Sequence, residues 1–246
     1  MKCSRVDARP RCAVISLGDS ALTLLRSLAA LAVFFCVLGS PTAAVIHVGI
    51  GGSDTTGDGS ALAPYGTIQH AVDMAVGPTD TISVSPGTYF ECVDASGKTG
   101  ISFVAEDGDP AATTIQGNTI CTTLNLGSGG TVSGFTITNG GASGLYARGN
   151  VTLTGNVFTG NGTQFDSDGG GARIESDTCT FGESTITITG NQFTSNTATN
   201  DGGGLAIVAG VHPVTLSMCA NVNVLVAGFI GSSLPMMLCA SDCAWG

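Results

Sequence analysis

VTLTGNVFTGN at residues 151–161 and ITITGNQFTSN at residues 186–196 are the two stretches that decide the fold. They share T-x-T-G-N-x-F-T-x-N, and Asp-Gly-Gly-Gly follows each of them, at residues 168–171 and 201–204. Short alternating strands broken by Gly and Asn occur in sandwiches, barrels and solenoids. A solenoid stacks equal positions of successive repeats about 4.8 Å apart, so it explains why the same residue types recur. The repeat therefore favours a solenoid, with a β-sandwich as the alternative.

Stacking of the two copies makes definite predictions for their side chains. We expect Phe158 and Phe193 to be buried neighbours in successive coils. The asparagines of the two copies are expected to form side-chain amide ladders at the turns, Asn156 with Asn191 and Asn161 with Asn196.

Further short strands precede this repeat. TISVS, ISFVA, TTIQG and TTLNL lie between residues 81 and 126, and a partial copy of the repeat, GFTITNGGASGLYA, spans residues 134–147. Each alternates apolar and polar residues and ends near Gly, Asn or Asp, which is typical of half-buried strands. We therefore predict parallel strands stacked in coils from about Thr81 to Ile207.

One helical pattern stands ahead of these strands. Five apolar residues recur there at helical spacing and form one stripe: Ile68, Ala71, Val72, Ala75 and Val76. Thr67 can cap the start of the helix, and Gly77-Pro78 can end it. We predict a helix over residues 67–76 that covers the open first coil, whose backbone groups would otherwise stay unpaired.

The chain also resembles a known superfamily. VIHVGIGGSD (45–54), APYGTIQHAVDMA (63–75) and DTISVSPGTY (80–89) follow one another as in many proteins of the pectin-lyase-like superfamily. The resemblance covers residues 45–210 and implies an all-β fold, a right-handed parallel β-helix with an N-terminal capping α-helix. The later coils are similar to polymorphic outer membrane protein repeats, which combine F-x-x-N with G-G-A-[ILV]. The second element departs at Arg173 and Leu205, so the resemblance implies a cell-surface role less directly than it implies the fold.

Residues 1–44 are predicted to be a secretory signal peptide. A basic stretch precedes the apolar run LAALAVFFCVL (28–38), and the small residues Thr42 and Ala44 suit a signal peptidase. Eleven apolar residues fall short of the about 20 that span a bilayer. We expect a secreted or cell-surface protein, outer membrane or extracellular, with the β-helix domain at 45–210. Residues 211–246 lack the repeat, and we interpret them as an atypical tail. This tail is a cap, a weak membrane segment, or a truncated or frame-shifted end.

Cleavage after Ala44 leaves six cysteines: Cys92, Cys121, Cys179, Cys219, Cys239 and Cys243. An even count in an oxidising compartment permits disulfides, and none of the spacings is typical of zinc sites. Cys92 and Cys121 are plausible partners across neighbouring coils, while the connectivity as a whole stays open.

The charge is strongly acidic, with a formal net charge of −10. After Ala44 only Lys98, Arg148 and Arg173 are basic, against sixteen Asp and Glu. Such a surface repels phosphate backbones, so we exclude nucleic acid as a partner. It is compatible with neutral or cationic glycans and with calcium, although we expect no cofactor. Solubility alone also explains the acidity, and we favour that interpretation.

Candidate catalytic residues follow from the resemblance. Superfamily relatives include polysaccharide lyases, whose chemistry uses a Lys or Arg base with calcium held by carboxylates. We predict that Lys98 is an exposed turn residue, whereas Arg148 or Arg173 could face a groove. The best carboxylates are Asp166, Asp168 and Asp201. We favour the interpretation that these are solvated turn residues, and we assign no catalytic or metal-binding residue.

Other titratable residues give weaker signals. The acidic cluster at residues 106–109 reads as a loop, His47, His70 and His212 have no metal or triad spacing, and His70 is expected at the surface. No Gly-x-Ser-x-Gly surrounds a candidate nucleophile.

The sequence thus predicts a non-catalytic adhesion, binding or scaffold protein for extracellular glycans or surface proteins. Membrane association would need the leader or a further C-terminal anchor. The alternative is a carbohydrate-active enzyme, a polysaccharide lyase or a glycosidase. A groove that holds Arg148 or Arg173 beside two or more Asp would favour the enzyme. A flank of Thr, Ser and Asn alone would favour binding.

Overall fold

The computed structural model describes residues 43–162, 168–176, 184–200 and 202–208, and it also describes the backbone of residues 214–222 and 236–238. Nearly all of the predicted leader lies outside the described residues. So do Asp166, Asp201, His212 and three of the cysteines, Cys179, Cys239 and Cys243.

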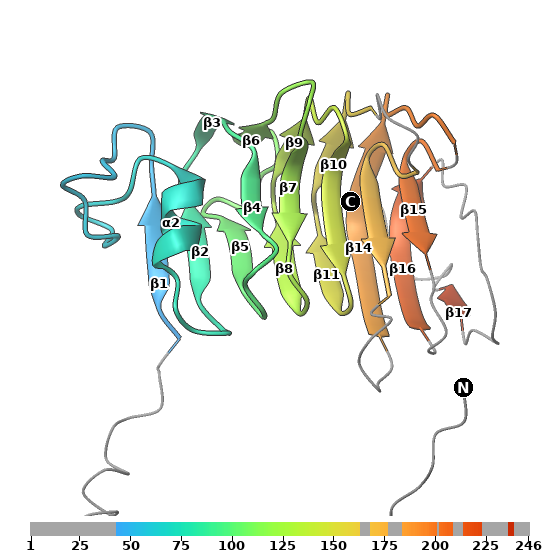
Figure 1. Cartoon of the computed structure of the whole chain (residues 1–246), viewed down its shortest axis with the longest axis horizontal. Helices are drawn as coiled ribbons and strands as arrows, with labels where there is room; N and C mark the ends of the chain where they lie inside the picture. Colours follow the sequence, from blue (N-terminus) through green and yellow to red (C-terminus); the bar gives the residue numbers. More distant parts are fainter. Residues whose placement is uncertain are drawn as a thin grey trace, which may run out of the picture. The chain divides into compact units, whose positions relative to one another are not determined.

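The described chain contains one helix, α2 (Ile68–Met74), and seventeen strands (Figure 1). Their bounds are β1 Val45–Val48, β2 Thr81–Val84, β3 Gly87–Phe90, β4 Val93–Ala95, β5 Ser102–Ala105, β6 Thr113–Gln116, β7 Thr122–Leu126, β8 Gly130–Ser133, β9 Thr136–Thr138, β10 Ser143–Arg148, β11 Val151–Thr154, β12 Val157–Thr159, β13 Ala172–Glu175, β14 Ser184–Thr194, β15 Leu205–Val208, β16 Val214–Val222 and β17 Met236–Leu238.

Every registered strand pair is parallel, and each of the four coils from β2 to β13 supplies one strand to each of three faces. The first face runs β1-β2-β5-β8-β11-β14, and the second runs β3-β6-β9-β12-β14. The long strand β14 joins these two faces into one twelve-stranded sheet. The third face is a separate sheet of five strands in the order β4-β7-β10-β13-β15. This arrangement confirms the predicted parallel solenoid and rules out the sandwich. The stack continues past Gly210, because β16 pairs in parallel with β14.

Columns of equal positions fill the interior between the three faces. On the second face, one column contains Tyr89, Ile115, Ile137, Phe158 and Phe193, all of them buried. Phe158 and Phe193 stack with ring centroids 4.8 Å apart and planes inclined by 8°. Their predicted burial in successive coils is therefore confirmed.

Both predicted asparagine ladders are also confirmed. Asn156 Nδ2 donates to Asn191 Oδ1 over 2.9 Å, and Asn161 Nδ2 donates to Asn196 Oδ1 over 3.0 Å. Asn156 Nδ2 and Asn161 Nδ2 also donate to the backbone of the coil before them, to Val132 O and Ile137 O. The ladders thus satisfy buried polar backbone groups where the chain turns.

Helix α2 lies against the first coil, beside β1 and β2, as expected for a cap (Figure 1). Thr67 is its N-cap and accepts a hydrogen bond from His70 N. The helix ends at Met74, two residues before the predicted end. Val76 therefore leaves the apolar stripe and is 91% exposed, which corrects its predicted place in the core. His70 is half-buried rather than at the surface, because its ring packs edge-on against Tyr65.

Two charged side chains from the first coil hold the ends of α2. Glu91 accepts hydrogen bonds from Ile68 N and Gln69 N, both at 2.9 Å. Lys98 Nζ donates to Ala75 O over 2.6 Å at the other end of the helix. A hydrogen-bond acceptor for the first N–H groups and a cation at the C-terminus both stabilise a helix. Lys98 is thus a half-buried helix clamp, which corrects the prediction of an exposed turn residue.

A disulfide joins Cys92, just before β4, to Cys121, just before β7. The two Cα atoms are 6.3 Å apart, and the bridge links successive coils next to the helix clamp. The plausible pairing of these two cysteines is confirmed.

Candidate functional site

The two arginines proposed as candidate bases lie together on the third face. Arg148 ends β10 and pairs in register with Glu175 of β13, while Arg173 pairs with Tyr146. Arg173 Nη2 donates to Glu175 Oε1 over 2.7 Å. Arg148 Nε lies 3.3 Å from Glu175 Oε2, and it also donates to Tyr146 Oη. Both guanidinium groups therefore share the carboxylate of Glu175.

Glu175 and Arg148 are both ionised in this cluster. Burial alone would raise the pKa of Glu175, but the hydrogen bond from Tyr146 and the charge of Arg173 hold that pKa below its usual value. The hydrogen bond to Tyr146, together with the charge of Glu175, raises the pKa of Arg148. A proton-abstracting arginine needs the opposite shift, because only the neutral form accepts a proton. The cluster thus disfavours a lyase base.

Of the three candidate carboxylates, only Asp168 lies among the described residues. Asp166 and Asp201 lie outside the described residues, and Asp168 precedes β13 in the turn before Gly169. The acidic stretch 106–109 is a loop between β5 and β6, as expected.

A histidine, a serine and a glutamate do meet on the first face. His47 Nδ1 lies 3.0 Å from Glu106 Oε1, and Ser83 Oγ donates to the same oxygen over 3.1 Å. The serine is bonded to the carboxylate rather than to the imidazole. This trio therefore lacks the nucleophile–base pair that covalent catalysis requires.

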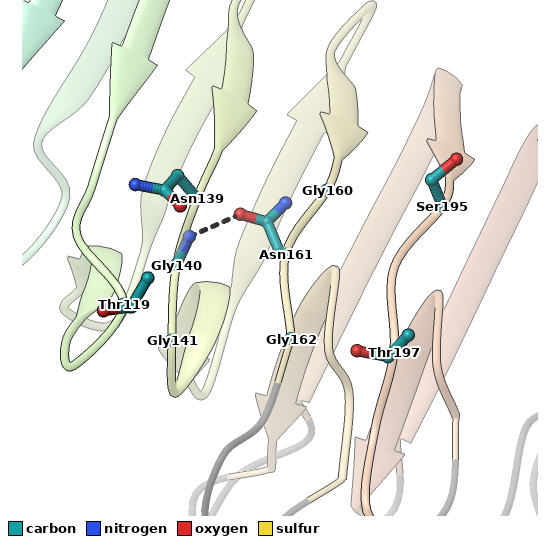
Figure 2. Close-up of a pocket in the computed structure, with 9 residues that line it drawn as sticks. All are labelled: Thr119, Asn139, Gly140, Gly141, Gly160, Asn161, Gly162, Ser195 and Thr197. Carbon is teal, nitrogen blue, oxygen red and sulfur yellow. Dashed lines mark hydrogen bonds between the residues drawn. The ribbon is translucent and has the colours of Figure 1, made fainter.

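A groove of about 260 Å³ opens where the second face turns into the third (Figure 2). Its lining is drawn from four successive coils: Thr119, Asn139, Gly140, Gly141, Gly160, Asn161, Gly162, Ser195 and Thr197. The turns that line it carry four glycines, so the backbone forms much of the wall. A Cβ on Gly141, for example, would lie 1.8 Å from Thr119 O, so no larger residue fits this packing.

The asparagine ladder of Asn161 and Asn196 positions the groove. Asn161 Oδ1 accepts from Gly140 N over 2.9 Å (Figure 2). Asn161 O accepts from Thr197 N over 2.8 Å. The ladder stops at Gly140, which has no side chain to continue it. The amide bonds thus fix three neighbouring turns in one register and hold the groove walls in place.

Three hydroxyl groups face the solvent from this groove. Thr119, Ser195 and Thr197 are exposed, and their hydroxyls make no hydrogen bond within the described part of the chain. Asn139 Nδ2 is bonded to Gly117 O, which fixes the amide. No described lining residue is titratable. The groove can therefore donate and accept hydrogen bonds, but the described lining offers no general acid or base.

The turns at the groove share a left-handed backbone. Asn139 has φ 60°, Gly160 has φ 63° and Ser195 has φ 54°, each at the equivalent place in its coil. Asn tolerates this conformation and Gly adopts it freely, whereas for Ser it costs on the order of 1 kcal/mol. Ser195 is thus held in a strained turn that points its hydroxyl group outward at the groove.

The described residues offer neither a metal-ligand cluster nor a membrane-spanning helix. Within them, no three His, Cys, Asp or Glu side chains gather as a set of metal ligands. Nor does the described part of the chain contain a helix long and apolar enough to cross a membrane.

Sequence reasoning missed Tyr146, Glu175 and the groove. Tyr146 and Glu175 lie on adjacent strands, and nothing in the sequence pairs these two residues, which are 29 residues apart. The groove residues were visible only as turn-formers. The described groove lining has the Thr, Ser and Asn residues expected of a binding protein, and it does not contain Arg148 or Arg173.

Comparison with known proteins supports the fold. A family model described as a right handed beta helix region matches residues 77–220, which is more than half of the chain. A search of curated proteins finds no match.

Proposed function

The chain belongs to the right-handed β-helix family, and we propose that it is an exported, non-catalytic member that binds a neutral glycan in the turn groove. The observation that carries the proposal is the described groove lining, which consists of hydroxyls, amides and glycine backbone without a titratable group. Sugar hydroxyls both donate and accept hydrogen bonds, so Thr119, Ser195 and Thr197 are suitable partners for them. Glycine turns let a ligand approach the backbone closely.

Charge supports a neutral ligand over a polyanion. The chain after Ala44 has sixteen acidic and three basic residues, so an acidic polysaccharide is repelled rather than steered toward it. Two of the three basic side chains share Glu175, and the third clamps α2. None of them serves the groove.

Export is supported by two observations. The leader pattern over residues 1–44 has a basic stretch, an apolar run and small residues at the expected cleavage site. The Cys92–Cys121 disulfide suits an oxidising compartment. Expression of the full chain in a bacterial host should yield a periplasmic or secreted product whose N-terminus is Val45. A cytosolic product with an intact leader would contradict export.

Glycan binding is tested by titrating the exported protein with neutral cello-, chito- and laminari-oligosaccharides. The double variant T119V/T197V removes two groove hydroxyls at nearly constant volume and should weaken binding by at least about tenfold. The matched control is Thr152→Val on the first face, which should leave binding unchanged. If no oligosaccharide binds, or if both variants behave alike, the groove is not the site.

The enzyme alternative has its own test. Incubation with pectate and calcium should give no unsaturated product, because neither arginine is poised to act as a base. Product that forms, and that disappears in Arg148→Ala or Arg173→Ala, would establish lyase activity instead.

A further inference from the structure

The third face carries a second cluster that the groove does not use. Its members are Tyr146, Arg148, Arg173 and Glu175, on the adjacent strands β10 and β13. We infer that this cluster is a receptor for a single carboxylate of a polypeptide partner, bound by the outer edge of Arg148. The inference is independent of the proposed function, because the two sites share no residue.

Among the described residues, the cluster holds one more positive charge than negative charge. Two guanidinium groups meet one carboxylate, which gives a net charge of +1. Both oxygens of Glu175 are occupied: Oε1 accepts from Arg173 Nε and Nη2, and Oε2 accepts from Tyr146 Oη over 2.7 Å. Glu175 is therefore saturated by donors, and the additional cation can accept a second anion.

The geometry singles out Arg148 as that cation. Its side chain is 67% exposed, whereas that of Arg173 is 27% exposed and bonded in a fork to Glu175. Arg148 uses only Nε within the described part of the chain, and its guanidinium lies over the Tyr146 ring, 5.5 Å from the centroid. The two terminal nitrogens therefore form a free planar edge, which matches the two oxygens of a carboxylate. Because Tyr146 already orients the group, little side-chain freedom is lost on binding.

The surroundings distinguish a polypeptide from an acidic polysaccharide. A polyuronate carries a negative charge on every sugar, and all but one of these charges would face a chain with sixteen acidic residues after Ala44. A polypeptide can present one carboxylate between neutral or basic residues. The single net charge of the cluster, set in an acidic molecule, is complementary to that pattern.

The test uses two blocked peptides, Gly-Lys-Glu-Lys-Gly and Gly-Lys-Gln-Lys-Gly, added to the exported full-length protein. Binding is followed by the NMR signals of the arginine side chains. The Glu peptide should shift the Arg148 signal and bind at least about tenfold more tightly than the Gln peptide. Non-specific attraction to the acidic protein works in the opposite direction, since the Gln peptide carries more positive charge.

Variants locate the receptor. Arg148→Gln should abolish the preference for the Glu peptide, and Arg148→Lys should retain only part of it, because an ammonium lacks the planar fork. Arg173→Gln should also reduce binding, since Glu175 then neutralises Arg148. Thr152→Val is the control and should bind normally. Equal binding of the two peptides, or an unchanged preference in Arg148→Gln, would overturn the inference. Tighter binding of polygalacturonate would overturn the choice of a polypeptide.

Discussion

The early coils and the late coils hold their stacks together by different means. The early coils, up to β7, rely on the clamped helix α2 and on the disulfide between Cys92 and Cys121. The late coils, from β8 onward, rely on two asparagine ladders and on the stacked pair Phe158 and Phe193. Among the described residues β1 is the first strand of the stack, and α2 covers that end of it. Interior coils can use equal residues at equal positions, because each neighbour supplies the partner.

Loss of a stacked ring should have the largest effect and should fall on the late coils. Phe158 is fully buried, so Phe158→Ala leaves a cavity and should lower the free energy of unfolding by about 3–5 kcal/mol. Chemical denaturation measures the change. Phe90→Ala is the control, because Phe90 is 77% exposed, and it should cost under about 0.5 kcal/mol. Similar losses in both variants would mean that the ring stack is not a main source of stability.

Removal of the disulfide should test the early coils. The bridge closes a segment with a sequence separation of 29, so the variant C92S/C121S should lose about 2–4 kcal/mol through the greater entropy of its unfolded chain. Thermal unfolding with and without reductant is the measurement. Reductant should destabilise the wild type more than the variant, by a similar amount. A variant as stable as the oxidised wild type would contradict this role.

A break in the asparagine ladder of Asn156 and Asn191 should have a smaller effect. Asn156→Ala removes bonds to Val132 O and Phe135 N and leaves buried backbone groups unpaired, at a cost of about 1–3 kcal/mol. Asn150 is the matched control, since it is exposed and accepts one bond, from Thr185 N. Asn150→Ala should cost clearly less in the same denaturation assay. The reverse order would show that the buried ladder is dispensable.

Relief of the strained turn at the groove should stabilise the late coils slightly. Ser195→Gly removes the left-handed strain at φ 54° and should raise the free energy of unfolding by up to about 1 kcal/mol. Ser133→Gly in strand β8 has no such strain to relieve and should be destabilising by about 0.5–1 kcal/mol. Denaturation of both variants compares the two positions, and a loss at Ser195 would argue against strain there.

The smallest effect concerns pH and the helix clamp of the early coils. Burial raises the pKa of Glu91 above its usual value, and Asp54 adds to the shift, although the bonds from Ile68 N and Gln69 N oppose it. The folded state therefore holds this proton more tightly than the unfolded state. The stabilisation from Glu91 is complete below its unfolded pKa and is lost as the pH rises through its folded pKa. The difference in stability between wild type and Glu91→Gln should thus decrease as the pH rises above the usual pKa of a glutamate. A constant difference would contradict the raised pKa.

The sequence predicted the ring stack and the asparagine ladders of the late coils most directly. The shared T-x-T-G-N-x-F-T-x-N pattern identified the stacked rings and both ladders, because a repeat states which residues lie above one another. The third face was missed in part: β4, β13 and β15 are short, and β10 contains a glycine that hides its alternation. Such strands form because neighbouring coils supply their hydrogen bonds, and a single-strand pattern does not contain that information.

By itself, the sequence determined the solenoid, its ladders and the capping helix, since these depend on local periodicity and on residues that recur at equal positions. Only the tertiary structure decided what the isolated charged residues do. Lys98 became a helix clamp, Arg148 and Arg173 met at Glu175, and the Thr, Ser and Gly turns opened a groove. The helix clamp joins Lys98 to Ala75 O across 23 residues, and the arginine cluster joins Tyr146 to Glu175 across 29 residues. The groove combines turns from four coils. No repeat in the sequence predicts the first two contacts.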